Sequence, residues 1–129
     1  MNWKKELAKK YGGQSEERRS GRARHVAGEM NATEKQFAEM LRLKQLAGDI
    51  LQFEFEAIKF RIGDRCFYTP DFVVWQPFNA GMVAYEIKGH WEDDARVKIK
   101  AAAARYPQVS FIAVKKVRYG WNYEEIKSR

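Results

Sequence analysis

A strand, a helix and a second strand follow one another within about thirty residues of the C-terminal half. The run "MVAYEIKG" (82–89) reads as a strand, and "EDDARVKIKAAAARYP" (92–107) opens with acids, continues through alanines and stops before a proline. The run "VSFIAVKKV" (109–117) is strongly apolar again. Strands joined by such a crossover lie parallel, with a right-handed connection. The chain is therefore predicted to place residues 109–117 parallel to residues 82–89 in one sheet.

One amphipathic helix is predicted upstream, in "NATEKQFAEMLRLKQLAGD" (31–49). Its apolar residues recur three and four positions apart, the period of a helix with one buried face. Asn31 or Thr33 can cap the start, and Gly48 can end the helix.

Between this helix and the crossover, the pattern is that of strands. The run "ILQFEFEAIKFRI" (50–62) alternates apolar and polar residues, as one half-buried strand or as two, and "RCFYTPDFVVWQ" (65–76) gives the next. With residues 82–89 they predict an antiparallel meander of three strands. The expected fold is α/β, with the order αβββαβ and a mixed central sheet flanked by helices.

Positive charge is concentrated in the first 28 residues. They hold eight basic side chains against three acids, a net charge of +5 in a chain of +7. Residues 1–28 have little apolar surface to bury, so we expect a flexible basic arm, with a short helix over Trp3–Lys10 or a solvated tail. Residues 29–129 are expected to form one domain. Clustered Lys and Arg bind phosphates, which favours a nucleic acid as the partner of the arm, through Arg18, Arg19, Arg22 and Arg24.

Composition favours a soluble cytoplasmic protein. The mean hydropathy is -0.63, and the sequence has no long uncharged apolar run and no apolar leader near Met1. The single cysteine, Cys66, cannot form an intramolecular disulfide or a zinc-finger type of site.

Two acids and a lysine stand at the ends of two apolar strand runs. Asp71 precedes "FVVW", whereas Glu86 and Lys88 share one face of the run 82–89 because side chains alternate along a strand. Neighbouring antiparallel strands can bring all three together. Converging carboxylates that are partly buried are best satisfied by a divalent cation, and oxygen ligands suit Mg²⁺ or Mn²⁺. The main-chain carbonyl of Ile87 can become a further ligand if the strand bends.

These residues match a known nuclease signature. The spacing of Pro70 and Asp71 to Glu86 and Lys88 resembles the PD-(D/E)XK motif of restriction-type nucleases. The flanking "YTPDF" and "EIKGHW" resemble the junction-resolving endonuclease I of T7-like phages, and the likeness extends over about residues 33–114. This resemblance implies a restriction-endonuclease-like core and an Mg²⁺-dependent endodeoxyribonuclease that cleaves branched DNA such as Holliday junctions. It further implies a homodimer that acts in DNA recombination and is encoded by a bacteriophage, hence located in the host cytoplasm.

The same resemblance implies a fourth acid on the helix before the sheet. Glu34 is the expected residue and Glu39 its competitor on another face of the helix. Asp71, Glu86 and Glu34 would bind the metal, and Lys88 would orient or deprotonate the attacking water. Whether Glu34 acts within its own chain or from a swapped partner stays open. Contacts to the DNA backbone are expected from Arg96, Lys98 and Lys100 of the second helix.

Structural explanations compete with each assignment. A glutamate in a first turn also favours the helix dipole, and acids at 92–94 are expected to cap the second helix. Glu86 and Lys88 can form an ordinary surface pair. At the level of function, the alternatives are a non-catalytic basic nucleic-acid-binding accessory protein, or a nuclease without structure preference.

Overall fold

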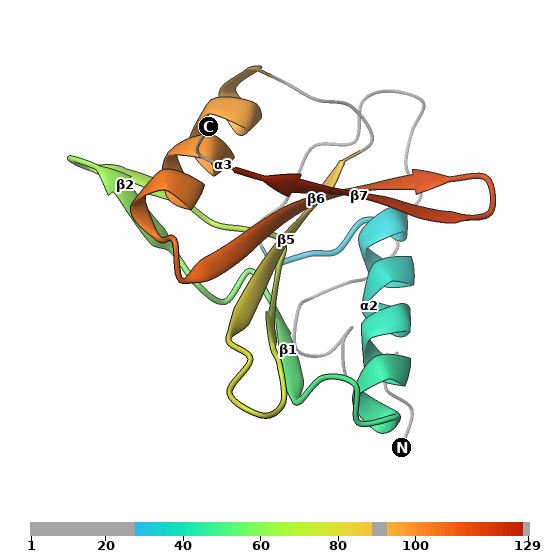
Figure 1. Cartoon of the computed structure of the whole chain (residues 1–129). Coiled ribbons are helices and arrows are strands. Elements are labelled where there is room, and N and C mark those ends of the chain that lie inside the picture. Colours follow the sequence, from blue (N-terminus) through green and yellow to red (C-terminus); the bar gives the residue numbers. More distant parts are fainter. Residues whose placement is uncertain (1–27, 89–92, 128–129) are drawn as a thin grey trace.

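The computed structural model describes residues 28–88 and 93–127 of the chain. The elements of this part are two helices and seven strands: α2 (Ala32–Leu46), β1 (Gln52–Phe55), β2 (Phe60–Gly63), β3 (Cys66–Tyr68), β4 (Phe72–Trp75), β5 (Met82–Lys88), α3 (Asp93–Arg105), β6 (Val109–Val117) and β7 (Gly120–Ile126). They form an α/β fold around a mixed sheet of five strands in the order β1-β4-β5-β6-β7 (Figure 1). The expected helix over Trp3–Lys10 lies outside the described residues.

The predicted crossover is present. β5 and β6 pair in parallel along their length, from Met82 opposite Val109 to Lys88 opposite Lys115, and α3 connects them. β1, β4 and β5 pair antiparallel, as expected for the first half of the sheet. The α/β class and the mixed sheet are therefore confirmed.

The predicted meander of three strands is wrong in one respect. Residues 50–76 form four strands, of which β2 and β3 make a separate two-stranded sheet. This hairpin packs beside α3, where the Phe60 and Tyr106 rings lie 5.1 Å apart and the Tyr106 hydroxyl donates to the Arg61 carbonyl at 2.7 Å. Alternation alone cannot distinguish one long strand from two that belong to different sheets.

A further strand, β7, follows the predicted order αβββαβ. It returns antiparallel beside β6, from Val117 opposite Gly120 to Phe111 opposite Ile126. The residues of "GWNYEEI" are mostly exposed, so this edge strand lacks the apolar run that predicts a strand.

The helices cover opposite faces of the sheet, so that the domain has three layers (Figure 1). On the α2 face, the fully buried Phe37 ring lies 5.2–5.5 Å from the rings of Phe72, Tyr85 and Trp121. On the α3 face, the core contains Ile99, Ala102 and Phe111. Residues of β5 alternate between these two cores, which puts Ala84, Glu86 and Lys88 on the α3 face.

The predicted ends of α2 are also confirmed. Asn31 is the N-cap, and its side-chain oxygen accepts a hydrogen bond from the backbone N–H of Glu34 at 2.8 Å. Gly48 follows the helix with φ of +83°, a left-handed conformation that glycine adopts without strain.

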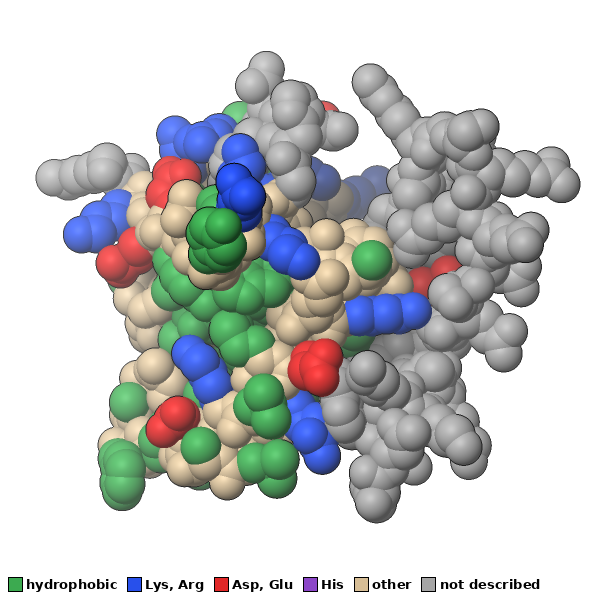
Figure 2. Space-filling model, turned by 90° about the vertical axis from the view of Figure 1, so that its right-hand side faces the viewer, with side chains coloured by type: hydrophobic (Ala, Val, Ile, Leu, Met, Phe, Trp, Pro, Cys, Tyr) green, Lys and Arg blue, Asp and Glu red, His purple; other side chains and the backbone are tan. Residues whose placement is uncertain are grey.

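The surface is mixed in character. On the face shown in Figure 2, Lys and Arg side chains border exposed apolar ones, with several basic groups in its upper part at the level of β6 and β7. Neither helix of the described part has the length and apolar composition needed to cross a membrane.

Candidate functional site

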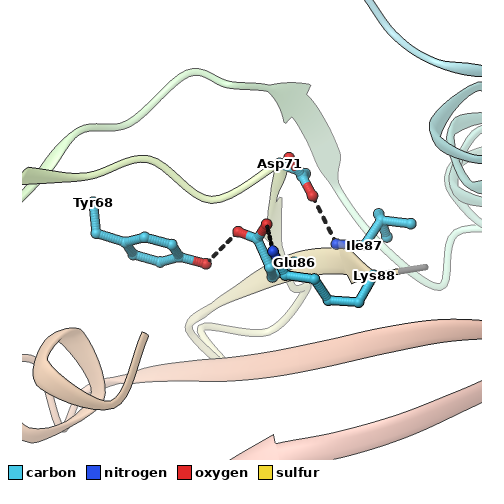
Figure 3. A network of polar contacts seen from close by, with 5 residues as sticks. All are labelled: Tyr68, Asp71, Glu86, Ile87 and Lys88. Atoms are coloured by element: carbon cyan, nitrogen blue, oxygen red, sulfur yellow. Dashed lines mark hydrogen bonds and ion pairs between the residues drawn. The ribbon is translucent and has the colours of Figure 1, made fainter. Parts of the chain in front are cut away.

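The register of the central hairpin brings the predicted acids together. Phe72, the first residue of β4, pairs with Tyr85 of β5, so Asp71 lies beside the segment that carries Glu86 and Ile87. Figure 3 shows the side chains of Asp71, Glu86 and Lys88 close together, where β4 begins and β5 ends. The sheet thus places two buried carboxylates and one lysine in a single cluster.

Asp71 is held by the backbone of β5. Its Oδ2 atom accepts a hydrogen bond from the Ile87 N–H at 2.7 Å, and its side chain also hydrogen-bonds that of Glu34. Burial is the largest cause that raises the pKa of Asp71 well above its ordinary value, followed by the negative charges of Glu86 and Glu34. Two carboxyl groups can share a hydrogen bond only when one is protonated. The site therefore favours a bound proton or another cation.

Glu86 has two partners on the α3 face. The Tyr68 hydroxyl donates to its Oε1 atom at 2.7 Å, and the Lys88 Nζ atom lies 3.0 Å from Oε2 (Figure 3). The Glu86 and Lys88 side chains are 12% and 16% exposed, so this is not the surface pair considered above. Burial and the charge of Glu86 raise the pKa of Tyr68 above its ordinary value, and its hydroxyl remains a donor.

Glu34 reaches the cluster from the first turn of α2. It is 3% exposed, and its Oε1 atom accepts from the Asn31 N–H at 2.8 Å, which completes a capping box. Glu34 and Asp71 meet within one chain. Glu39, the competing residue, is exposed on the same helix. Glu34 therefore combines a capping role with proximity to the site.

These residues line an open cleft of about 600 Å³. The first residues of α2 and of α3 both contribute to its wall, so the positive ends of two helix dipoles face it. The lining consists of Asn31, Glu34, Glu56, Phe67, Tyr68, Thr69, Asp71, Glu86, Ile87, Lys88, Asp94, Ala95 and Lys98.

The predicted basic residues are distributed unevenly. Lys98 lines the cleft, whereas Lys100 is exposed and does not line it. Arg96 lies 3.6 Å from the Glu124 carboxylate of β7, an ion pair that directs it toward the sheet edge. The arm residues Arg18, Arg19, Arg22 and Arg24 lie outside the described residues.

Three residues of the cleft are not among the site residues that the sequence predicts. Tyr68 belongs to the separate hairpin, and only the packing of that hairpin against α3 brings it to Glu86. Glu56 has a positive φ of 48°, and its N–H donates to the Asp71 carbonyl at 2.8 Å, so it fixes the backbone beside the site. Asp94 was expected only to cap α3. Its place in the cleft wall adds another carboxylate.

The donor set fits a hard divalent cation in chemistry and charge. Carboxylate oxygens are the ligands of Mg²⁺, and a cation would relieve the repulsion that raises the pKa of Asp71. Within residues 28–88 and 93–127, however, no three His, Cys, Asp or Glu side chains stand as a ready ligand set. Glu34 and Glu86 instead direct oxygens to Asn31, Tyr68 and Lys88. Metal binding would exchange some of these contacts for coordination.

Comparisons of the chain with protein-family models, with curated proteins and with solved structures return no match.

Proposed function

We propose that the protein is a metal-dependent endodeoxyribonuclease that hydrolyses phosphodiester bonds, with Mg²⁺ as cofactor and Mn²⁺ able to replace it. The observation that supports this most is the juxtaposition of Asp71, Glu86 and Glu34 beside Lys88 in one cleft. The preferred substrate is branched DNA, and the active form is a homodimer; both follow from the resemblance to junction-resolving nucleases.

The energetics of the cluster argue for a chemical role. Burying carboxylates near one another lowers the stability of the fold unless a cation or proton compensates. A protein that only binds DNA needs basic surface and gains nothing from this arrangement. The non-catalytic alternative therefore leaves the buried carboxylates of Asp71 and Glu86 without an explanation, whereas Glu34 also caps α2.

Each residue has a distinct expected task. Asp71 and Glu86 would hold the metal, Glu34 would do so directly or through water, and the Ile87 carbonyl is a further candidate. When bound, Mg²⁺ supplies an activated water and stabilises negative charge on the phosphate. Lys88, 3.0 Å from Glu86, would orient the attacking water and offset charge at the phosphate. Tyr68 would keep Glu86 in place through its hydrogen bond.

The basic residues would hold the DNA by its backbone. Lys98 is the helix residue best placed for this, because it shares the cleft wall with Lys88. Contacts of this kind depend on salt and little on sequence. The basic arm would add further contacts of the same type.

The decisive experiment incubates the protein and Mg²⁺ with a four-way junction, a flap, a linear duplex and single-stranded DNA. Cleavage of the junction at the highest rate is expected, and Asp71→Ala or Lys88→Ala should abolish it. Glu34→Ala should reduce it by about a hundredfold, whereas the matched variant Glu39→Ala, exposed on the same helix, should not.

The outcomes separate the three candidate functions. Binding without cleavage on every substrate would identify a non-catalytic accessory protein. Equal cleavage of plain duplex and junction would indicate a nuclease without structure preference. Full activity of Asp71→Ala would overturn the assignment of the site itself.

Subunit mixing tests how the dimer is built. Since Glu34 meets Asp71 within one chain, each subunit is expected to carry a complete site. Mixed Glu34→Ala and Asp71→Ala subunits should then stay inactive. Recovered activity would show instead that the two acids come from different chains. Sedimentation should give twice the 15.1 kDa mass of the chain.

A further inference from the structure

Three polar residues form a row across the sheet next to the candidate site. Lys88 of β5 pairs with Lys115 of β6, and Lys115 pairs with Asn122 of β7. Residues that pair across neighbouring strands project from the same face of a sheet. Because Glu86 and Lys88 lie on the α3 face, the whole row lies on that face.

The row borders a second hollow, of about 370 Å³, which Lys88 also lines. Its walls include Lys88, Lys115, Asn122 and Glu124. Its floor includes Ala113, which stands between Glu86 and Glu124 in the adjacent row and whose small side chain leaves space. Lys88 also lines the carboxylate cleft, so the two hollows meet at this lysine.

The chemistry of this hollow suits an anion that is in contact with water. Lys115 and Asn122 are both exposed and offer an ammonium and an amide donor. The acid in the wall, Glu124, has Arg96 at 3.6 Å, which offsets its charge. Neighbouring strands lie about 4.8 Å apart, so the row from Lys88 to Asn122 extends over roughly 10 Å. A row of that length can contact more than one phosphate of an extended backbone.

We propose that this row, Lys88, Lys115 and Asn122, carries the phosphate backbone of the DNA strand that leaves the cleft, with Lys115 on a phosphate next to the one cleaved. The proposal rests on the function proposed above and adds the direction in which the strand runs. It runs across β5, β6 and β7 rather than along α3, where Arg96 is engaged by Glu124.

Binding measurements test the row separately from cleavage. Labelled junction and duplex DNA are titrated with the full chain in EDTA, by fluorescence anisotropy, at several salt concentrations. Loss of one phosphate contact should lower the association constant about five- to tenfold near ~0.1 M salt. It should also reduce, by about 1, the steepness with which the logarithm of that constant falls with the logarithm of the salt concentration. This result is expected for Lys115→Ala, and a smaller loss for Asn122→Ala. Lys44→Ala, exposed at the C-terminal end of α2, is the matched control and should bind like the unmodified protein.

A neutral phosphate analogue locates the contact. In a cleavage assay with Mg²⁺, a single methylphosphonate replaces one phosphate of the DNA, at one position on either side of the cut. At one of these positions, the replacement should lower the cleavage rate of the unmodified protein by about the same factor as the Lys115→Ala substitution does on unmodified DNA. The same replacement should not lower the cleavage rate of Lys115→Ala any further. Binding by Lys115→Ala equal to that of Lys44→Ala, or failure of the protein to bind DNA, overturns the proposal. Weakened binding by Lys115→Ala without cleavage on any DNA overturns the nuclease function but retains the row.

Discussion

Asp71 shows how the site opposes the stability of the fold. Its carboxyl group is buried, its Oδ2 atom receives the Ile87 N–H, and its other neighbours include the acids Glu34 and Glu86. One backbone hydrogen bond does not outweigh burial and two like charges, and the pKa of Asp71 is raised. The carboxyl group of Asp71 therefore resists ionisation.

This raised pKa sets the sign of a pH dependence. An acid with a higher pKa in the folded state contributes stability that is complete below its unfolded pKa of ~4, and this stability is lost as pH rises through the folded pKa. With EDTA present, the unfolding free energy should fall with rising pH. Asp71→Asn, which keeps an acceptor for the Ile87 N–H, should remove that fall and be about 1–3 kcal/mol more stable at neutral pH.

Urea unfolding from pH 4 to pH 8 measures this effect. Asp64→Asn is the matched control, because Asp64 is exposed in the β2–β3 turn and its carboxylate stays in water. A decline with pH that persists unchanged in Asp71→Asn would show that another group is responsible.

Tyr68 provides the second test at this scale. Tyr68→Phe removes only the hydroxyl that donates to Glu86 at 2.7 Å, leaving a buried carboxylate with one donor fewer. A loss of about 1–3 kcal/mol in unfolding free energy is expected, and cleavage should slow by about tenfold as Glu86 loses its fixed position. Tyr119→Phe is a matched hydroxyl deletion at an exposed tyrosine outside the cleft, and it should leave the cleavage rate unchanged. Equal cleavage rates for the Tyr68→Phe variant and the unmodified protein would show that the Tyr68 hydroxyl does not contribute to cleavage.

At the scale of elements, α2 serves the core and the site with different residues. Phe37 and Leu41 are buried against the sheet, whereas the first turn carries Glu34 to the cleft. The capping box couples the two roles, because Asn31 and Glu34 exchange hydrogen bonds in both directions. The position of Glu34 thus depends on how well the helix begins.

Asn31 variants test this coupling. Asn31→Ala removes the side-chain acceptor for the Glu34 N–H and should lower stability by about 0.5–2 kcal/mol. The frayed first turn should also slow cleavage severalfold. Asn31→Ser restores a capping oxygen, and both stability and cleavage should recover. Thermal unfolding and the junction assay report the two quantities. Recovery of stability without recovery of cleavage would contradict the coupling.

Strands were predictable from sequence only where their burial is regular. Residues 82–88 and 109–117 are rich in apolar side chains that pack on the two helix-covered faces, and their predicted parallel pairing is confirmed. The residues 50–62 contain an equally regular pattern, yet they divide between two sheets. β7 is an exposed edge, whose sequence is set by solvent rather than by a core. The pattern of apolar and polar residues along a strand indicates which side chains are buried. It does not identify the strand or helix against which they are buried.

Across the whole molecule, five elements meet at the cleft. The start of β4, the end of β5, the first turns of both helices and the β2–β3 hairpin all contribute residues to it. Its acids come from residues far apart in sequence, such as Glu34 and Asp94. A cation bound there would therefore link the elements and stabilise the fold as a unit.

Mg²⁺ should raise the stability of the folded protein without any DNA present. At a hundred times its dissociation constant, a ligand bound only to the folded state adds about 2.7 kcal/mol, which corresponds to a rise of several degrees in the unfolding temperature. Differential scanning fluorimetry with MgCl₂, against NaCl at equal ionic strength, measures this shift. Asp71→Asn should show a much smaller rise. An equal rise in both proteins would place Mg²⁺ elsewhere.

Local features follow from the order of the amino acids alone. They are the cap at Asn31, the end of α2 at Gly48, the crossover from β5 to β6, and the shared face of Glu86 and Lys88. Each depends on neighbours in the chain or on a two-residue period, and local physics is sufficient for them. The remaining features depend on how the elements pack in three dimensions. It separated the β2–β3 hairpin, buried Glu34 but not Glu39, brought Tyr68 to Glu86, and aligned Lys88 with Lys115 and Asn122. These contacts join residues distant in sequence, and their geometry follows from how the sheet and helices pack rather than from any local preference.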